Sequence, residues 1–201
     1  MRVKRAIAWA SGIGLLLHAV LLVASWILSA AWPELNVQSL LSSQGIRWTF
    51  GSFTENLTQP FFLWLVLSAM AWSLCRRSQL GTALRHPRQL NYRCRTALTI
   101  TLLEIAVIVL VFAYLTCTPH AVLLGITGHL VPSRFVYNLI PTLALCMVFV
   151  AVTYGLISGV LRSIHDIVGG LSAGVEAIAP LVVLYVIAVQ LVFTTAYVFM
   201  F

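Results

Sequence analysis

A single acidic side chain lies deep within an apolar stretch of this sequence. Glu104 is the one charged residue between positions 97 and 117. A charge in a membrane-crossing segment costs at least ~2.5 kcal/mol on insertion scales, so its carboxyl group should face a partner or water, or be protonated. Two interpretations stay open here. Glu104 forms a proton or substrate site, or it is a structural residue that is protonated or paired with Arg93 or Arg95.

Other polar and small residues in the apolar runs are of the types that form contacts between membrane helices. Asn138 and Gln190 can form hydrogen bonds between helices at modest gain. Two pairs of glycines are each spaced four residues apart, at Gly155 and Gly159 and at Gly170 and Gly174. Small residues at this interval let helices approach closely, so we expect helix packing there, either within one chain or at a dimer seam.

No spacing of side chains typical of an enzyme occurs. The sequence has no pattern of a Ser-His-Asp, Cys-His or paired-carboxylate site. The four cysteines, at positions 75, 94, 117 and 146, form no CxxC pair and no His-interleaved cluster, and His120 and His129 have no acid nearby. We therefore predict no catalytic residue, no metal site, no disulfide framework and no cofactor, and we do not expect an enzyme.

The composition places these residues in a membrane. Of the 201 residues, 61% are hydrophobic and 8% are charged, which is too apolar for one soluble core. The expected fold is an all-α integral membrane protein of one domain, with about five transmembrane helices and short interfacial amphipathic helices. The predicted spans lie near 6–31, 57–75, 97–117, 135–161 and 177–201.

Short helices are expected beside these spans. In the outer loop 32–56 and just beyond it, Ile46, Phe50, Phe53 and Leu57 share one helical face, which predicts a helix lying on the outer surface. The other outer loop is 118–134.

The link between the last two spans has a pattern of its own. Its apolar residues between Ile164 and Val175 recur at helical spacing, which is typical of an interfacial amphipathic helix. Ser163 followed three residues later by Asp166 has the spacing of a capping box.

Basic residues indicate the orientation. Six arginines fall within the loop 76–96, and ten of the twelve basic residues lie on one predicted side of the membrane. The positive-inside rule makes that side cytoplasmic, so the N-terminus is inside, the C-terminus is outside and the chain is a multi-pass protein of the cell's inner membrane. The net charge of +7 is explained by this topology and by contact with the lipid bilayer, and we expect no nucleic-acid partner.

Two blocks of the sequence resemble one family. The later block consists of 128–133 (GHLVPS), Phe135, Pro141, Tyr154, Gly155, Gly159, Arg162, Ser163, Asp166, Val168, Ser172 and Gln190. The earlier block consists of 39–42 (SLLS), 45–48 (GIRW), Asn56, Thr58, Arg77 and Ser78. In this order they resemble the AbgT family of p-aminobenzoyl-glutamate transporters, whose members carry a "PS.F" segment before a "YG…G..[KR]S..D" turn.

The resemblance implies secondary transport of p-aminobenzoyl-glutamate or related small aromatic carboxylates, driven by an ion gradient in a homo-oligomer. Such transporters place broken helices at the midplane, so the substrate or coupling candidates are Glu104, Asn138, Pro141, Pro180 and Gln190. The family motifs "SN…SD.G" and "GSAS.KW", which build its substrate site, do not occur in this sequence, so no site residue is carried over. The chain therefore resembles a reduced family member. The alternative is a non-transporting scaffold or accessory subunit that has lost the transport core. A partner membrane chain that supplies the missing hairpin would reconcile the two interpretations.

Overall fold

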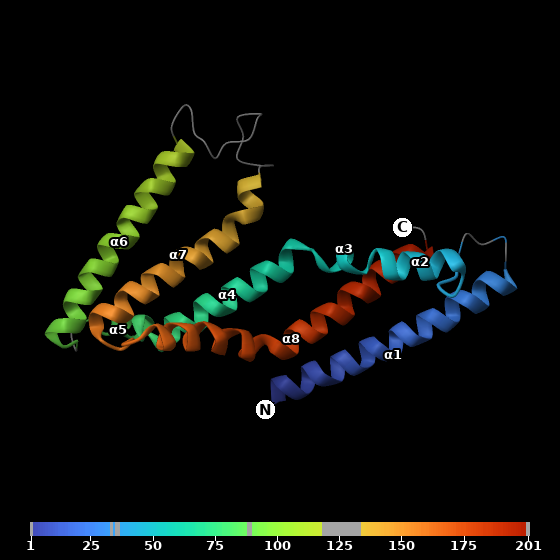
Figure 1. Cartoon of the computed structure of the whole chain (residues 1–201), viewed down its shortest axis with the longest axis horizontal. Coiled ribbons are helices and arrows are strands. Elements are labelled where there is room, and N and C mark those ends of the chain that lie inside the picture. The colour runs from blue at the N-terminus through green and yellow to red at the C-terminus, as the bar shows by residue number, and fades with distance from the viewer. Residues whose placement is uncertain (1, 33, 35–36, 88–89, 118–133, 200–201) are drawn as a thin grey trace. The chain divides into compact units, whose positions relative to one another are not determined.

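The computed structural model describes residues 2–32, 34, 37–87, 90–117 and 134–199. This part of the chain forms eight α-helices and contains no strand (Figure 1). The helices are α1 (Arg2–Ala31), α2 (Ser43–Gly51), α3 (Phe53–Leu57), α4 (Pro60–Arg77), α5 (Leu80–Arg85), α6 (Tyr92–Cys117), α7 (Arg134–Ser158) and α8 (Ile164–Phe199).

Four of the described helices, α1, α6, α7 and α8, are long and apolar enough to cross a membrane. The predicted second span corresponds to α4, which has 18 residues and ends with Arg76 and Arg77, and it is not among the four. Large apolar side chains remain mostly exposed along the long helices, including Trp9 at 75% and Leu110 at 69%. Because water would penalise such a surface, the chain is an all-α, multi-pass membrane protein, as its composition predicted.

The last helix differs from the prediction. We expected a link near 164–175 and a separate span from 177, but α8 is one continuous helix of 36 residues with Pro180 inside it. The sequence changes from amphipathic to apolar at this point, but the backbone stays helical. Neighbouring groups in a membrane protein can satisfy the backbone carbonyl that a proline leaves free.

The predicted capping box at the start of α8 is confirmed. The Ser163 backbone N–H donates to Oδ2 of Asp166 at 3.2 Å, and the Asp166 backbone N–H donates to the Ser163 hydroxyl at 3.2 Å. Each side chain thus satisfies a backbone donor at the helix N-terminus, which fixes where α8 begins.

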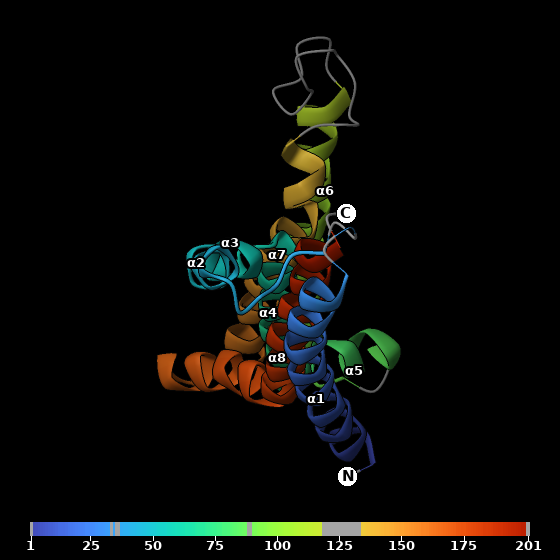
Figure 2. The same ribbon diagram turned by 90° about the vertical axis from the view of Figure 1, so that its right-hand side faces the viewer.

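The chain divides into two compact units. The first contains Met1–Phe62 and Ile178–Phe201, and the second contains Leu63–Ala177. In the first unit, α1 and the C-terminal half of α8 run side by side in two views (Figures 1 and 2). A Cβ atom added to Gly14 of α1 would lie 2.8 Å from Ile187 of α8, so the small residue permits this approach.

The second unit is built on the pair α6 and α7. Its buried cluster joins these two helices to α5 and consists of Leu80, Ala83, Ala97, Leu98, Val150 and Tyr154. Ala97 is fully buried, so its small side chain lies directly in the helix contact. This packing fixes which residues of α6 and α7 face each other.

Candidate functional site

The candidate site is a pair of polar side chains on α6 and α7. Glu104 lies midway along α6, and the Thr153 hydroxyl of α7 donates a hydrogen bond of 3.3 Å to its Oε1. The other carboxyl oxygen, Oε2, is buried and has no hydrogen-bond partner. A buried polar atom without a partner is costly in an apolar environment, so this oxygen marks a place where a proton, a water molecule or a ligand would be stabilised.

The alternative pairing of Glu104 with Arg93 or Arg95 is wrong. The Arg93 Nε donates instead to the backbone carbonyl of Ile157 at 2.8 Å. Glu104 follows Arg93 by 11 residues and Arg95 by nine, or ~16 and ~14 Å along the helix, and its Oε1 is bonded to Thr153 while its Oε2 has no partner. Among the described residues, the ion pair that the structure forms joins Arg77 to Asp166 at 3.6 Å.

Asn138 and Pro141 lie elsewhere on α7. Asn138 is exposed, and its backbone carbonyl accepts a hydrogen bond of 2.7 Å from the Thr142 hydroxyl. Pro141 is half-buried within the helix. Asn138 precedes Thr153 by 15 residues, which corresponds to ~22 Å along α7. The structure therefore does not bring Asn138 to the Glu104 carboxyl group.

Gln190 and Pro180 belong to the first unit. The Gln190 amide nitrogen donates a hydrogen bond of 3.2 Å to the backbone carbonyl of Phe53 in α3. The prediction that Gln190 forms a hydrogen bond to another helix is confirmed. Pro180 is half-buried and lies ten residues before Gln190, which corresponds to ~15 Å along α8.

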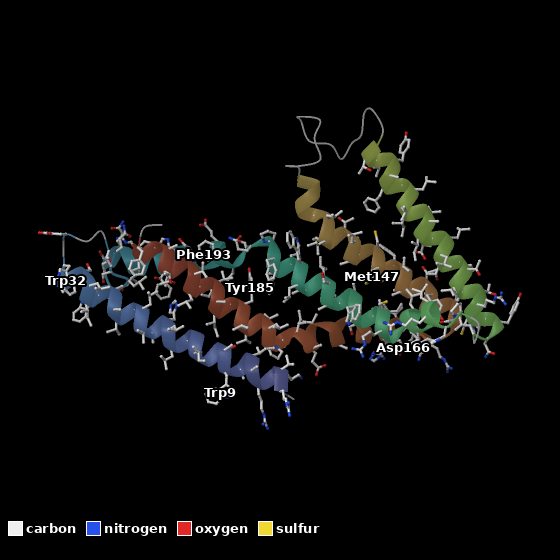
Figure 3. The ribbon with its side chains drawn as sticks, turned by 180° about the vertical axis from the view of Figure 1, so that it is seen from behind. Trp9, Trp32, Met147, Asp166, Tyr185 and Phe193 are labelled. Carbon is white, nitrogen blue, oxygen red and sulfur yellow. The ribbon has the colours of Figure 1, made fainter. Side chains whose placement is uncertain are left out.

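Two residues near these candidates were missed from the sequence. Thr153 is the hydrogen-bond partner of Glu104. It was missed because it is one of several threonines in the apolar helices and nothing in the sequence distinguishes it from the others. Tyr185, labelled on α8 in Figure 3, donates from its hydroxyl to the Leu57 carbonyl at 3.5 Å. Its ring stacks against Phe61 and Phe62 at centroid distances of 6.1 and 5.5 Å. Both roles depend on contacts between residues far apart in the sequence, which no local spacing reveals.

The two glycine pairs meet different partners within the second unit. A Cβ atom at Gly170 would lie 2.7 Å from a Leu74 methyl group, and one at Gly174 would lie 2.8 Å from the Met70 Cα. These two glycines therefore let α8 approach the backbone of α4.

The pair at the end of α7 has another role. Gly155 is covered by the buried Leu161. Gly159 has a φ of +81°, and its added Cβ would lie 3.0 Å from the Arg93 guanidinium carbon. These contacts shape the turn that follows α7.

No group of three metal-ligating side chains forms among the residues that the structure describes. The thiols of Cys75, Cys94 and Cys146 are free. His120, His129 and the segment 128–133 of the family resemblance lie outside the described residues.

These features define the class: a multi-pass helical membrane protein with a carboxyl group held between two spans. The comparison with known families goes further. The family model described as "AbgT putative transporter family" matches residues 81–199, more than half of the chain, and the protein belongs to this family. The resemblance found in the sequence is thereby confirmed. The matched range contains all five candidate site residues and begins after the earlier resembling block at 39–78. No curated protein and no solved structure matches the chain.

Proposed function

We propose that this protein takes part in secondary transport of p-aminobenzoyl-glutamate or a related small aromatic carboxylate, with Glu104 as the residue that couples transport to a proton gradient. The observation that carries the proposal is the Glu104 carboxyl group, placed midway along a membrane helix with Thr153 at Oε1 and no partner at the buried Oε2. Membership of a transporter family supports the same class of function.

The geometry suits a proton better than a metal cation. A bound metal cation in a protein usually has several oxygen ligands, as the six or more of Ca²⁺ illustrate. The Thr153 hydroxyl is bonded to the Glu104 carboxyl group, and the described residues hold no group of three His, Cys, Asp or Glu side chains that could bind a metal. A proton needs only the carboxyl oxygen itself. In this proposal the Thr153 hydroxyl donates to the carboxylate when the proton has left.

We propose that the protein lies in the inner membrane with its N-terminus in the cytoplasm and its C-terminus outside. The arginines at 76–96 support this orientation. We propose that it works as a homo-oligomer or with a partner membrane chain, and not as an enzyme. The five candidate residues lie in two separate units of the chain. The second candidate function is a scaffold or accessory subunit whose partner chain supplies the rest of the site, because the family motifs "SN…SD.G" and "GSAS.KW" do not occur in this sequence.

Uptake into proteoliposomes that contain only this purified chain tests the proposal. We expect labelled p-aminobenzoyl-glutamate to accumulate above the level of protein-free vesicles when a proton gradient is imposed, and to equilibrate without one. Absence of uptake by folded, inserted protein would contradict transport by this chain alone and would favour the accessory role.

A further inference from the structure

We propose that the segment 43–59, which contains α2 and α3, does not lie flat on the outer surface but enters the membrane alongside α8 and lines a water-filled path from the outside. This inference concerns the first unit alone and does not depend on the proposed substrate or on Glu104.

The contacts between this part of the chain and α8 follow a strict order. The Gln38 backbone N–H donates to the Val198 carbonyl at 3.0 Å, and the Trp48 ring stacks on Tyr197 with centroids 4.3 Å apart. Residues further along the segment contact residues that come earlier in α8, as two hydrogen bonds show. Phe53 meets Gln190 and Leu57 meets Tyr185, both through backbone carbonyls.

This order shows that the segment runs antiparallel to α8. The partners on α8 extend from Val198 back to Tyr185, which are 13 residues apart, or ~20 Å along a helix. Figure 1 shows α2 beside the C-terminal end of α8. A helix lying across the membrane surface would meet only one or two turns of a helix that crosses the membrane.

The depth of the segment in the bilayer is inferred from its position along α8. Residues 178–199 of α8 contain no charged side chain and belong to a helix suited to crossing a membrane. The hydrocarbon core of a bilayer is ~30 Å thick. A segment that accompanies α8 for ~20 Å therefore reaches well below the headgroups before α4 continues toward the arginines at its end.

The backbone of the segment is satisfied in a manner that suits this depth. The helix is interrupted at Ser52 and again at Thr58 and Gln59. Non-helical backbone within a membrane persists only where other groups provide hydrogen bonds. At the interruptions, the backbone N–H groups of Ser52 and Thr58 donate to carbonyls within the segment. The side chains of Gln190 and Tyr185 donate to the carbonyls at the two ends of α3, Phe53 and Leu57.

The exposed side chains of the segment separate into two faces. The apolar face, with Ile46 47%, Phe50 82% and Phe53 45% exposed, is suited to lipid acyl chains. Glu55 is also exposed, and it follows Phe53 by two residues, which places it on the opposite side of α3. A charged side chain within a membrane faces protein or a water-filled cavity. Since Glu55 lies between the residues that contact Gln190 and Tyr185, we assign its face to water.

Depth measurements with spin labels test the insertion. In the full chain with its four cysteines replaced, single cysteines for labelling are introduced at Phe50 and Phe61, and at the exposed Val192 and Val183 of α8 as depth references. We expect the label at position 50 to lie at the depth of the label at 192, and the label at 61 to lie deeper, close to that at 183. Equal shallow depths at positions 50 and 61 would overturn the insertion.

Thiol reactivity tests the water-filled path. We expect Glu55→Cys in proteoliposomes to react with a membrane-impermeant methanethiosulfonate added outside at least tenfold faster than Phe53→Cys at the neighbouring depth. Equal, slow reaction of both variants would contradict the path. Each variant must elute like the wild type in size-exclusion chromatography. If Glu55→Cys fails to fold, Thr54→Cys, at the neighbouring exposed position, takes its place.

Discussion

The guanidinium group of Arg93, at the start of α6, lies against Gly159, just beyond the end of α7. Its Nε donates to the Ile157 carbonyl at 2.8 Å, and a Cβ atom at Gly159 would come within 3.0 Å of the guanidinium carbon. Arg93 therefore satisfies one of the carbonyl groups that the C-terminal turn of a helix leaves without an intrahelical donor. The contact ties the two central helices of the second unit together at one end.

Replacing Gly159 with alanine should destabilise the protein. Its φ of +81° is unfavourable for any residue with a Cβ atom, and the added methyl group would press on Arg93. We expect a loss of about 1 to 2 kcal/mol, seen as a lower melting temperature in detergent. Gly12→Ala is the matched control, because nothing lies within 4 Å of a Cβ there. A similar loss in both variants would contradict a special role for Gly159.

Gly174→Ala should be more damaging than Gly170→Ala. The added methyl group at position 174 meets the backbone at Ala69 and Met70, whereas at position 170 it meets mainly the end of the Leu74 side chain. A side chain can change rotamer, but a packed helix backbone must move as a whole. We expect a loss of about 2 to 3 kcal/mol at position 174 and less at 170. Equal melting temperatures of the two variants would show that α8 does not approach α4 this closely.

Gln190→Leu should weaken the first unit. The change keeps the size of the side chain but leaves the Phe53 carbonyl without its donor at 3.2 Å. Hydrogen bonds between membrane helices contribute about 0.6 kcal/mol on average and up to about 1.7. We expect a loss within this range in thermal unfolding. Thr195→Val is the control, since Thr195 bonds to the Leu191 carbonyl within its own helix, and it should leave the melting temperature nearly unchanged.

The sequence was informative wherever a local pattern decides the structure. The apolar runs predicted the helices and the membrane class, and the spacing of Ser163 and Asp166 predicted the start of α8. The continuity of α8 was not predicted, because the change of hydropathy near Val175 resembles the end of a helix although no residue there stops one.

The candidate site was predictable only in part. An acid in an apolar run identified Glu104 directly, since burial of a charge is a property of the segment itself. Its partner Thr153 lies 49 residues away, and Tyr185 and Leu57 are 128 residues apart. Such contacts depend on how the helices pack, and helical periodicity shows which face is apolar but not which helix lies against it.

The central claim is that Glu104 carries the proton that accompanies the substrate. The most direct test is to measure proton entry into proteoliposomes with a pH-sensitive dye enclosed, after p-aminobenzoyl-glutamate is added outside, for the wild type, Glu104→Gln and the control Glu176→Gln. Glu176 is an exposed acid on α8, so its replacement should leave coupling intact. We expect substrate-dependent acidification with the wild type and Glu176→Gln, and at least a tenfold lower rate with Glu104→Gln. Equal proton entry with Glu104→Gln and the wild type would contradict the central claim.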